Sequence, residues 1–122
     1  DNLHYTESHE WIRIEGDKAI VGITDYAQDA LTDVVWVELA EMGSKVGAME
    51  PCASVESVKS VSEIYAPIAG EIVESNDALE DAPEAINQDP YGEGWIFALK
   101  IDDGSQVEGL LDAATYSGLI GD

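Results

Sequence analysis

Short runs of β-branched and aromatic residues, separated by turn residues, constrain the fold of this chain more than any other feature of its sequence. The runs at 11–14 and 18–21 flank Glu15-Gly16-Asp17, a pattern that predicts a β-hairpin. Further strands are expected within 34–39, 53–73 and 95–101. Many short strands with small helical additions predict a compact β sandwich or barrel.

One β-like stretch, between Cys52 and Ala66, is too long for a single ordinary strand. We therefore expect a bend near its middle, although no Asn-Gly or Asp-Gly pair marks a turn there. Pro67 and Gly70 predict a second turn, because proline lacks the donor of a strand ladder and glycine tolerates positive φ.

Three capping-box patterns predict short helices. Asp25 precedes Gln28 by three residues, so a helix is expected from there to about Leu31. The box at 81–84 predicts one or two helical turns before Asp89-Pro90. The box at 105–108 predicts the start of a C-terminal helix, with a second short turn at Asp112.

The charge balance limits the partners of the chain. The sequence has 122 residues, which is the length of a single domain over 1–122, and its five basic against 26 acidic residues give a net charge of -21. So few cations argue against binding to nucleic acid or to anionic membrane surfaces. No apolar stretch is long enough to span a membrane, and the lone Cys52 fits a reducing compartment such as the cytoplasm.

The residues that self-contained catalysis would need are missing from the sequence. His4, His9 and Cys52 are too few for a zinc site, and no EF-hand loop is present. The nucleophile-elbow and phosphate-loop motifs are absent as well. We therefore expect a protein that is not an enzyme by itself.

Lys59 is the unusual residue, because it interrupts the β-like segment 55–61 in a chain poor in cations. Its ammonium must reach water, and the simplest geometry puts it on a protruding bend, where the amine is open to covalent modification. Taken alone, the tetrapeptide Glu56-Ser57-Val58-Lys59 favours an ordinary surface lysine.

Blocks along nearly the whole chain resemble the H protein of the glycine cleavage system, a family of lipoyl carriers. The matching blocks are 9–11, 21–28, 37–39, 55–59, 66–67, 70–73 and 89–95. Any one of them could occur by chance, whereas all of them in this order within one domain are highly specific.

The resemblance implies a mainly β fold, a barrel-sandwich hybrid like that of lipoyl and biotinyl domains, with short helices and a C-terminal helix. It implies that Lys59, at a tight hairpin turn, carries lipoate as an amide. The cofactor would supply the chemistry, and the protein would be a non-catalytic carrier that presents it.

The resemblance also implies a set of partners. A pyridoxal-phosphate glycine decarboxylase would pass an aminomethyl group to the lipoyl arm, and a tetrahydrofolate-dependent aminomethyltransferase would take it. A flavin- and NAD-dependent dihydrolipoyl dehydrogenase would then reoxidise the arm, and a lipoate-attaching enzyme would have installed it. We expect a monomer in the cytoplasm, or in the mitochondrial matrix if a transit peptide was removed.

We hypothesise that Ser8, Glu10 and Glu63 line a dock for the loaded arm, because carboxylates would favour its cationic end. The alternative is that these residues form an ordinary solvated face.

Three other functions remain open at this stage. A biotin carrier usually has methionine on both sides of the lysine, where this chain has Val58 and Ser60. A lipoyl domain of a 2-oxo acid dehydrogenase usually belongs to a longer chain and lacks the blocks at 9–11 and 89–92. An H-like protein could instead pass lipoate to other enzymes, or serve as an acidic binding module with Lys59 bare.

Overall fold

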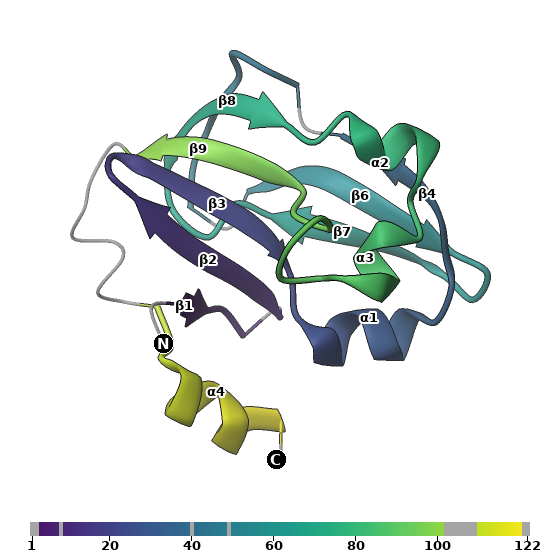
Figure 1. Ribbon diagram of the computed structural model, residues 1–122. Coiled ribbons are helices and arrows are strands. Elements are labelled where there is room, and N and C mark those ends of the chain that lie inside the picture. Colours follow the sequence, from purple (N-terminus) through teal and green to yellow (C-terminus); the bar gives the residue numbers. More distant parts are fainter. Residues whose placement is uncertain (1–2, 8, 40, 49, 102–109, 121–122) are drawn as a thin grey trace.

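The computed structural model describes residues 3–7, 9–39, 41–48, 50–101 and 110–120, whose strands form two antiparallel sheets (Figure 1). The six-stranded sheet has the order β1 (Leu3–Tyr5), β2 (Glu10–Glu15), β3 (Lys18–Ile23), β9 (Phe97–Ile101), β8 (Gly70–Ser75) and β5 (Lys45–Val46). The three-stranded sheet has the order β4 (Val34–Glu38), β6 (Pro51–Ser57) and β7 (Val61–Tyr65). Within the described ranges neither sheet closes into a barrel.

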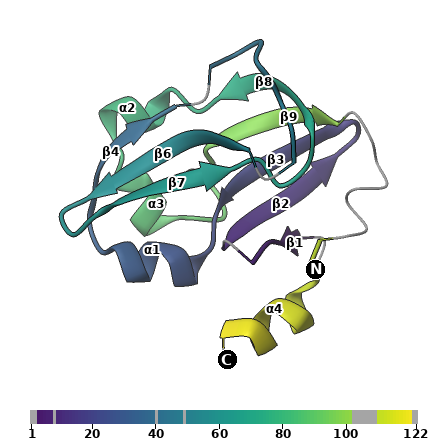
Figure 2. The same ribbon diagram turned by 180° about the vertical axis from the view of Figure 1, so that it is seen from behind.

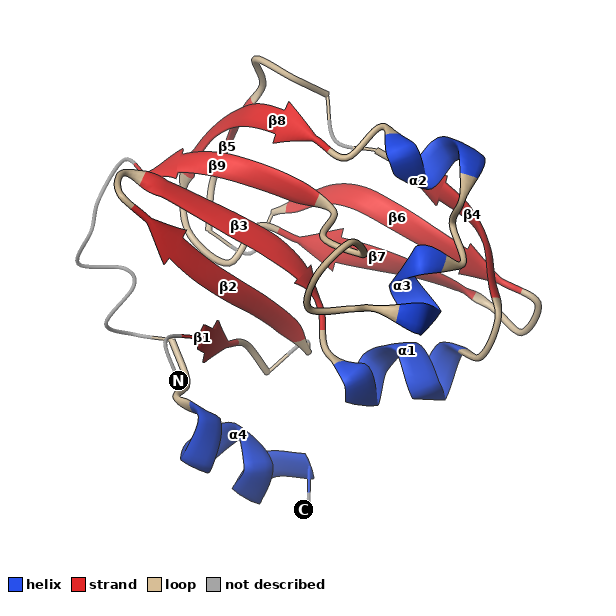
Figure 3. Cartoon of the chain, viewed as in Figure 1, coloured by secondary structure: helices blue, strands red, loops and turns tan. Residues whose placement is uncertain are grey.

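The described part of the chain also contains four short helices (Figure 3). They are α1 (Asp25–Leu31), α2 (Ala78–Asp81), α3 (Ala85–Gln88) and α4 (Ala113–Ile120). The first three gather at one end of the sheets, where α1 contacts α3 and α2 contacts β4, whereas α4 contacts β1 (Figure 1). In the described part of the chain, no helix is long and apolar enough to cross a membrane.

The main core lies between the two sheets. Ile12, Phe97 and Leu99 of the six-stranded sheet and Val55 of the three-stranded sheet are completely buried there. Figure 2 shows the three-stranded sheet from its outer side. Since successive strand residues point to opposite faces, the inward residues of β6 alternate with exposed ones such as Glu56.

A second, smaller core covers the other face of the six-stranded sheet. Trp11 is completely buried on this face, and its ring leaves room only for glycine at position 22, where a Cβ would lie 2.7 Å from the ring. Tyr116 of α4 stacks on Tyr5 of β1 with ring centroids 4.7 Å apart. The C-terminal helix thus packs against β1, at the edge of the six-stranded sheet.

The structure confirms the expected fold class, a mainly β barrel-sandwich hybrid with short helices and a C-terminal helix, in the form of two separate sheets. The predicted hairpin is β2–β3, and its turn uses Gly16 at a φ of 66°. The bend expected between Cys52 and Ala66 separates β6 from β7.

Two of the predicted helix starts were wrong. The N-cap of α1 is Thr24, whose hydroxyl accepts the Ala27 N–H at 3.2 Å, so the predicted capping residue Asp25 lies inside the first turn. Asp81 ends α2, a helix that the sequence did not predict, and α3 begins only at Ala85 without a side-chain cap.

The start predicted for the C-terminal helix, at 105–108, lies outside the described residues. The helical turn expected at Asp112 is the beginning of α4, where the Asp112 carboxylate accepts the Thr115 N–H at 2.8 Å.

Candidate functional site

Lys59 lies at the tip of the β6–β7 hairpin, with its side chain exposed. The tip projects beyond the neighbouring strands and helices (Figures 1 and 2). Ser57 and Ser60 close the turn through a backbone hydrogen bond of 2.8 Å from the Ser57 N–H to the Ser60 carbonyl.

The Ser57 side chain organises this turn. Its hydroxyl oxygen accepts the N–H groups of Lys59 at 3.1 Å and Ser60 at 3.0 Å, and the hydroxyl lies 3.1 Å from the Ser60 carbonyl, to which it donates. Two-residue hairpin loops usually need positive φ, which glycine or asparagine supplies. Neither Val58 nor Lys59 has positive φ. The turn is held instead by the hydrogen bonds of the Ser57 hydroxyl.

The turn is also tied to the body of the protein. The Val58 N–H donates to the carbonyl of Asp33, just before β4, at 3.1 Å. Among the described residues, Lys59 has no ion-pair partner. The backbone that carries Lys59 is therefore held by hydrogen bonds, whereas its amine forms no ion pair with a carboxylate of the described residues.

All other basic residues belong to the six-stranded sheet: Arg13, Lys18, Lys45 and Lys100. Arg13 pairs with Glu15 and Lys18 pairs with Glu74, each at 2.9 Å. Lys59 is therefore the only lysine or arginine carried by the strands of the three-stranded sheet and the turn between β6 and β7.

Glu10, predicted to line an arm dock, is buried, with 1% of its surface exposed. Its carboxylate accepts a hydrogen bond of 2.5 Å from the Thr6 hydroxyl and one of 3.1 Å from the Tyr65 N–H. Burial raises the pKa of Glu10 above its ordinary value, although these two hydrogen bonds oppose the shift. Glu10 thus links β2 to the end of β7.

Glu63, the second predicted dock residue, is exposed on β7. It lines a cavity of about 150 Å³ with an apolar wall formed by α1 residues such as Ala27 and Leu31, together with Ile64 of β7. His9 and Tyr26 are the other ionisable residues in the lining. This cleft combines an apolar wall with the Glu63 carboxylate. The wall can contact a chain of methylene groups, and the carboxylate can interact with a cation at the end of that chain.

Ser8, the third predicted dock residue, lies outside the described residues. The structure thus describes two of the three candidates: Glu10 is buried, whereas Glu63 is exposed two residues before Tyr65, to which Glu10 bonds.

His9 is a residue of this cleft that the sequence analysis did not select. It has a φ of 71°, which is uncommon for a residue other than glycine. Its Nδ1 lies 2.8 Å from the Tyr116 hydroxyl, and its ring packs on Tyr26 with centroids 4.7 Å apart. Burial lowers the pKa of His9, which favours the neutral ring.

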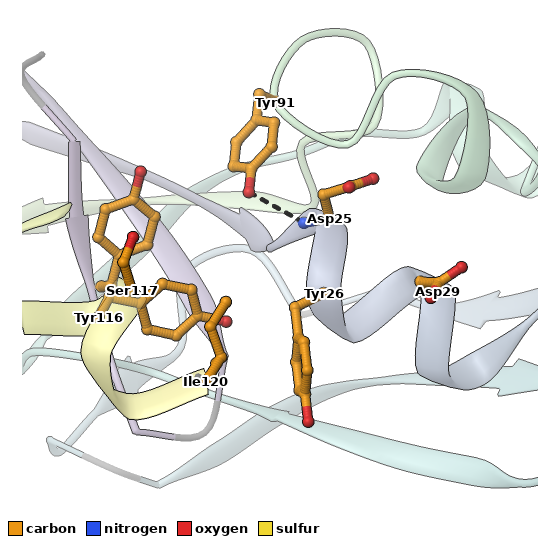
Figure 4. A pocket seen from close by; sticks show the side chains of 8 residues that line it. Asp25, Tyr26, Asp29, Tyr91, Tyr116, Ser117 and Ile120 are labelled. Atoms are coloured by element: carbon orange, nitrogen blue, oxygen red, sulfur yellow. Dashed lines mark hydrogen bonds between the residues drawn. The ribbon is translucent and has the colours of Figure 1, made fainter. Parts of the chain in front are cut away.

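A larger cavity, of about 470 Å³, lies between α1 and α4 (Figure 4). Tyr5, Tyr91 and Tyr116 line it, and Tyr26 lines both this cavity and the cleft beside Glu63. The Asp25 N–H donates to the Tyr91 hydroxyl at 2.9 Å. Burial raises the pKa of Tyr5, Tyr91 and Tyr116, so these hydroxyls keep their protons and serve as neutral hydrogen-bonding groups.

The Cys52 thiol is not an alternative nucleophile to the Lys59 amine. Burial raises the pKa of Cys52 to about 12, so its thiol stays protonated and is a poor nucleophile at neutral pH. No cluster of three histidine, cysteine or carboxylate side chains suitable for a metal ion occurs among the residues described.

Comparisons with known proteins agree on one family. The family model described as Glycine cleavage H-protein matches residues 3–122. A glycine cleavage system H protein of Thermus thermophilus is 63% identical over 112 residues, which cover 92% of this chain and 88% of that protein. One from Halorhodospira halophila is 53% identical over 123 residues, covering 100% of this chain and 95% of that protein.

A solved structure shows the same fold. The crystal structure of a glycine cleavage system H protein from Mycobacterium marinum matches with a TM-score of 0.91 and 44% sequence identity. The match covers 99% of this chain and 98% of the other.

The role of Ser57 in the turn can be tested by Ser57→Ala. The substitution removes the acceptor of two N–H groups, so we expect it to lower the free energy of unfolding by about 1–2 kcal/mol. Amide hydrogen exchange of Lys59 and Ser60 should also accelerate. Urea unfolding and exchange measured by NMR provide the two readouts.

The matched control is Ser54→Ala, on the same strand, whose hydroxyl contacts only the exposed Glu38 carboxylate at 3.3 Å. We expect a change within about 0.5 kcal/mol. If both variants behave alike, the hydroxyl of Ser57 does not hold the turn.

The buried state of Glu10 predicts a specific pH dependence. Its folded pKa lies above the ordinary 4.5, so the folded protein binds this proton more tightly than the unfolded chain does. The contribution of Glu10 to the free energy of unfolding is therefore largest below pH 4.5 and falls as pH rises through the folded pKa. Urea titrations from about pH 4 to about pH 7 should show that Glu10→Gln lacks this decrease. Equal pH slopes for the two proteins would mean that the Glu10 carboxyl is not perturbed.

Proposed function

The chain belongs to the glycine cleavage H-protein family, and from this premise we propose that it is a non-catalytic lipoyl carrier of a glycine cleavage system, with Lys59 as the attachment residue. The observation that carries the proposal is the exposed Lys59 amine on a turn fixed by Ser57 and Asp33. The Cys52 thiol is half-buried and stays protonated at neutral pH, so we expect the chemistry to come from an attached group.

Lys59 fits the requirements for amide formation. Once deprotonated, its Nζ can attack the carbonyl carbon of a lipoyl group activated as an acyl adenylate by a lipoate-attaching enzyme. The new C–N bond forms, the C–O bond to AMP breaks, and Nζ gives up a proton. An internal ion pair would oppose this loss of charge, and none holds Lys59 among the described residues.

When attached, lipoate supplies a dithiolane that carries the one-carbon unit and the reducing equivalents. We propose that the chain presents it in turn to a pyridoxal-phosphate glycine decarboxylase, a tetrahydrofolate-dependent aminomethyltransferase and a flavin- and NAD-dependent dihydrolipoyl dehydrogenase. The net charge of -21 would raise the encounter rate with cationic surfaces on these enzymes. Fast encounters suit a shuttle that must also leave each partner.

We further propose that the cleft beside Glu63 receives the loaded arm. Ala27, Leu31 and Ile64 offer apolar contact for its methylene chain, and the Glu63 carboxylate would favour a cationic end. Glu10 is buried and accepts the Tyr65 N–H, and its contact with the arm stays a prediction. Ser8 stays a prediction.

Intact mass spectrometry tests the attachment residue. Incubation with a lipoate-attaching enzyme, lipoate and ATP should add the mass of one lipoyl group to the wild-type protein and nothing to Lys59→Arg, because arginine keeps the charge but cannot form the amide. A mass gain that persists in Lys59→Arg would move the attachment site elsewhere.

The dock is tested by the release of ammonia from the loaded protein. We expect faster release from Glu63→Ala than from wild type, because the loaded arm loses its carboxylate partner. The control is Glu80→Ala, which removes an exposed carboxylate from α2. Equal release from all three proteins would show that Glu63 does not protect the arm.

A further inference from the structure

Apolar side chains surround the exposed lysine and are not covered by the fold. Val58 in the turn is 70% exposed, and Val61 at the start of β7 is 65% exposed. Trp36 and Val35 of β4 are 55% and 48% exposed. We call these four residues the tip patch. Single exposed apolar residues are normal, but a group that includes a tryptophan is typical of a binding surface.

A β-bulge creates half of this patch. The pairing of β4 with β6 shifts between Val34 and Trp36, so that Val35 is the extra residue. As a result Val34 and Val37 are buried while Val35 and Trp36 both face solvent. In a regular strand one of these two neighbours would point to the core. Bulges of this kind often direct side chains at functional sites.

The pairing register places Trp36 and Val61 on the outer face of the three-stranded sheet, one on each side of Glu56. Trp36 lies opposite Glu56, and Glu56 lies opposite Val61. Trp36 and Val61 therefore share this face in one row, two strand spacings or about 10 Å apart. Val58 follows at the tip, next to Lys59.

The charges around the patch are acidic. Asp33, Glu38, Glu56 and Glu63 are exposed on the strands and connections that carry it, and Lys59 is the only basic residue there. A complementary surface would offer an apolar pocket for Trp36 with arginine or lysine at its rim. A second copy of this chain cannot provide that rim, because its own tip is acidic and its net charge is -21.

The position of the Lys59 Nζ, the atom that is acylated, indicates which partner binds the tip patch. An enzyme that acylates the Lys59 Nζ must bring its active site within one lysine side chain of the turn, so its surface must cover Val58 and Val61. Enzymes that act on the far end of an attached arm need not approach so closely. We propose that the tip patch is the docking surface for the lipoate-attaching enzyme, with Trp36 as the anchor. This inference rests on the proposed function and assigns it a recognition surface.

Attachment kinetics test this inference. The substrate is the unmodified protein, and the measured quantity is kcat/KM for lipoyl attachment by intact mass. We expect Trp36→Ala to lower kcat/KM at least tenfold, mainly through KM, which is the scale of an interface hot spot. Val61→Thr keeps the strand preference, and we expect it to lower kcat/KM several-fold. Acylation of Lys59 by a small activated ester should not change, because the amine stays equally accessible.

Two controls remove equally exposed apolar side chains elsewhere. Met42 is 60% exposed and Leu119 is 50% exposed. Met42→Ala and Leu119→Ala should leave kcat/KM unchanged. Unchanged values for Trp36→Ala and Val61→Thr would overturn the docking surface, and so would an equal loss in the two controls.

A binding measurement separates docking from chemistry. Lys59→Arg cannot be acylated, so its Kd for the attaching enzyme can be measured at equilibrium, and adding Trp36→Ala should raise this Kd at least tenfold. Trp11 is buried and Trp95 half-buried, so a fluorescence change on binding should come mainly from Trp36 and vanish with it. If wild-type protein gains no lipoyl group on Lys59, the proposed function itself fails. If it does but Trp36→Ala binds and reacts normally, only the docking surface fails.

Discussion

The hydrogen bonds of the Ser57 hydroxyl are the interaction on which presentation of Lys59 depends. β6 lies between β4 and β7, so the residue that begins the turn belongs to the central strand of its sheet. The Ser57 hydroxyl connects the turn to this central strand, because it accepts the consecutive N–H groups of Lys59 and Ser60. The Asp33 carbonyl, in the connection before β4, accepts the Val58 N–H. The backbone at the tip is thereby fixed, while the lysine side chain keeps its freedom. A carrier needs this combination of a fixed base and a mobile arm.

The distribution of charge adds a second constraint. Four of the five basic residues lie in the six-stranded sheet, two of them paired with glutamates, so Lys59 is the only lysine or arginine on the strands and hairpin turn of the three-stranded sheet. Acylation would remove that last positive charge and leave an acidic surface around the tip. A partner with a basic rim would thus meet a more favourable surface after attachment than before. Recognition of the unmodified protein must then rely more on apolar contact, which the exposed Trp36 and Val61 can provide.

The sequence predicted those features whose signal is local. Gly16 marks the β2–β3 turn directly, and strand length required a bend in the segment that became β6 and β7. The turn type was not predictable, because it depends on a serine side chain instead of a glycine. The burial of Glu10 was hidden for a different reason. Its partners are Thr6 and the backbone of Tyr65, and the second of these lies 55 positions away in the sequence. No local pattern distinguishes such a carboxylate from an exposed one.

The C-terminal helix is connected to the cleft beside Glu63 through a series of side-chain contacts. Local sequence patterns do not predict these contacts either. The Tyr116 hydroxyl lies 2.8 Å from His9 Nδ1 and 2.7 Å from the Thr24 hydroxyl, and Thr24 caps α1, which forms the apolar wall of the cleft. His9 also packs on Tyr26, which separates the cleft from the larger cavity beside α4. One tyrosine therefore fixes both the histidine that lines the cleft and the start of the helix that walls it. Because these partners lie 107 and 92 positions from Tyr116 in the sequence, the shape of the cleft depends on the docking of the last helix.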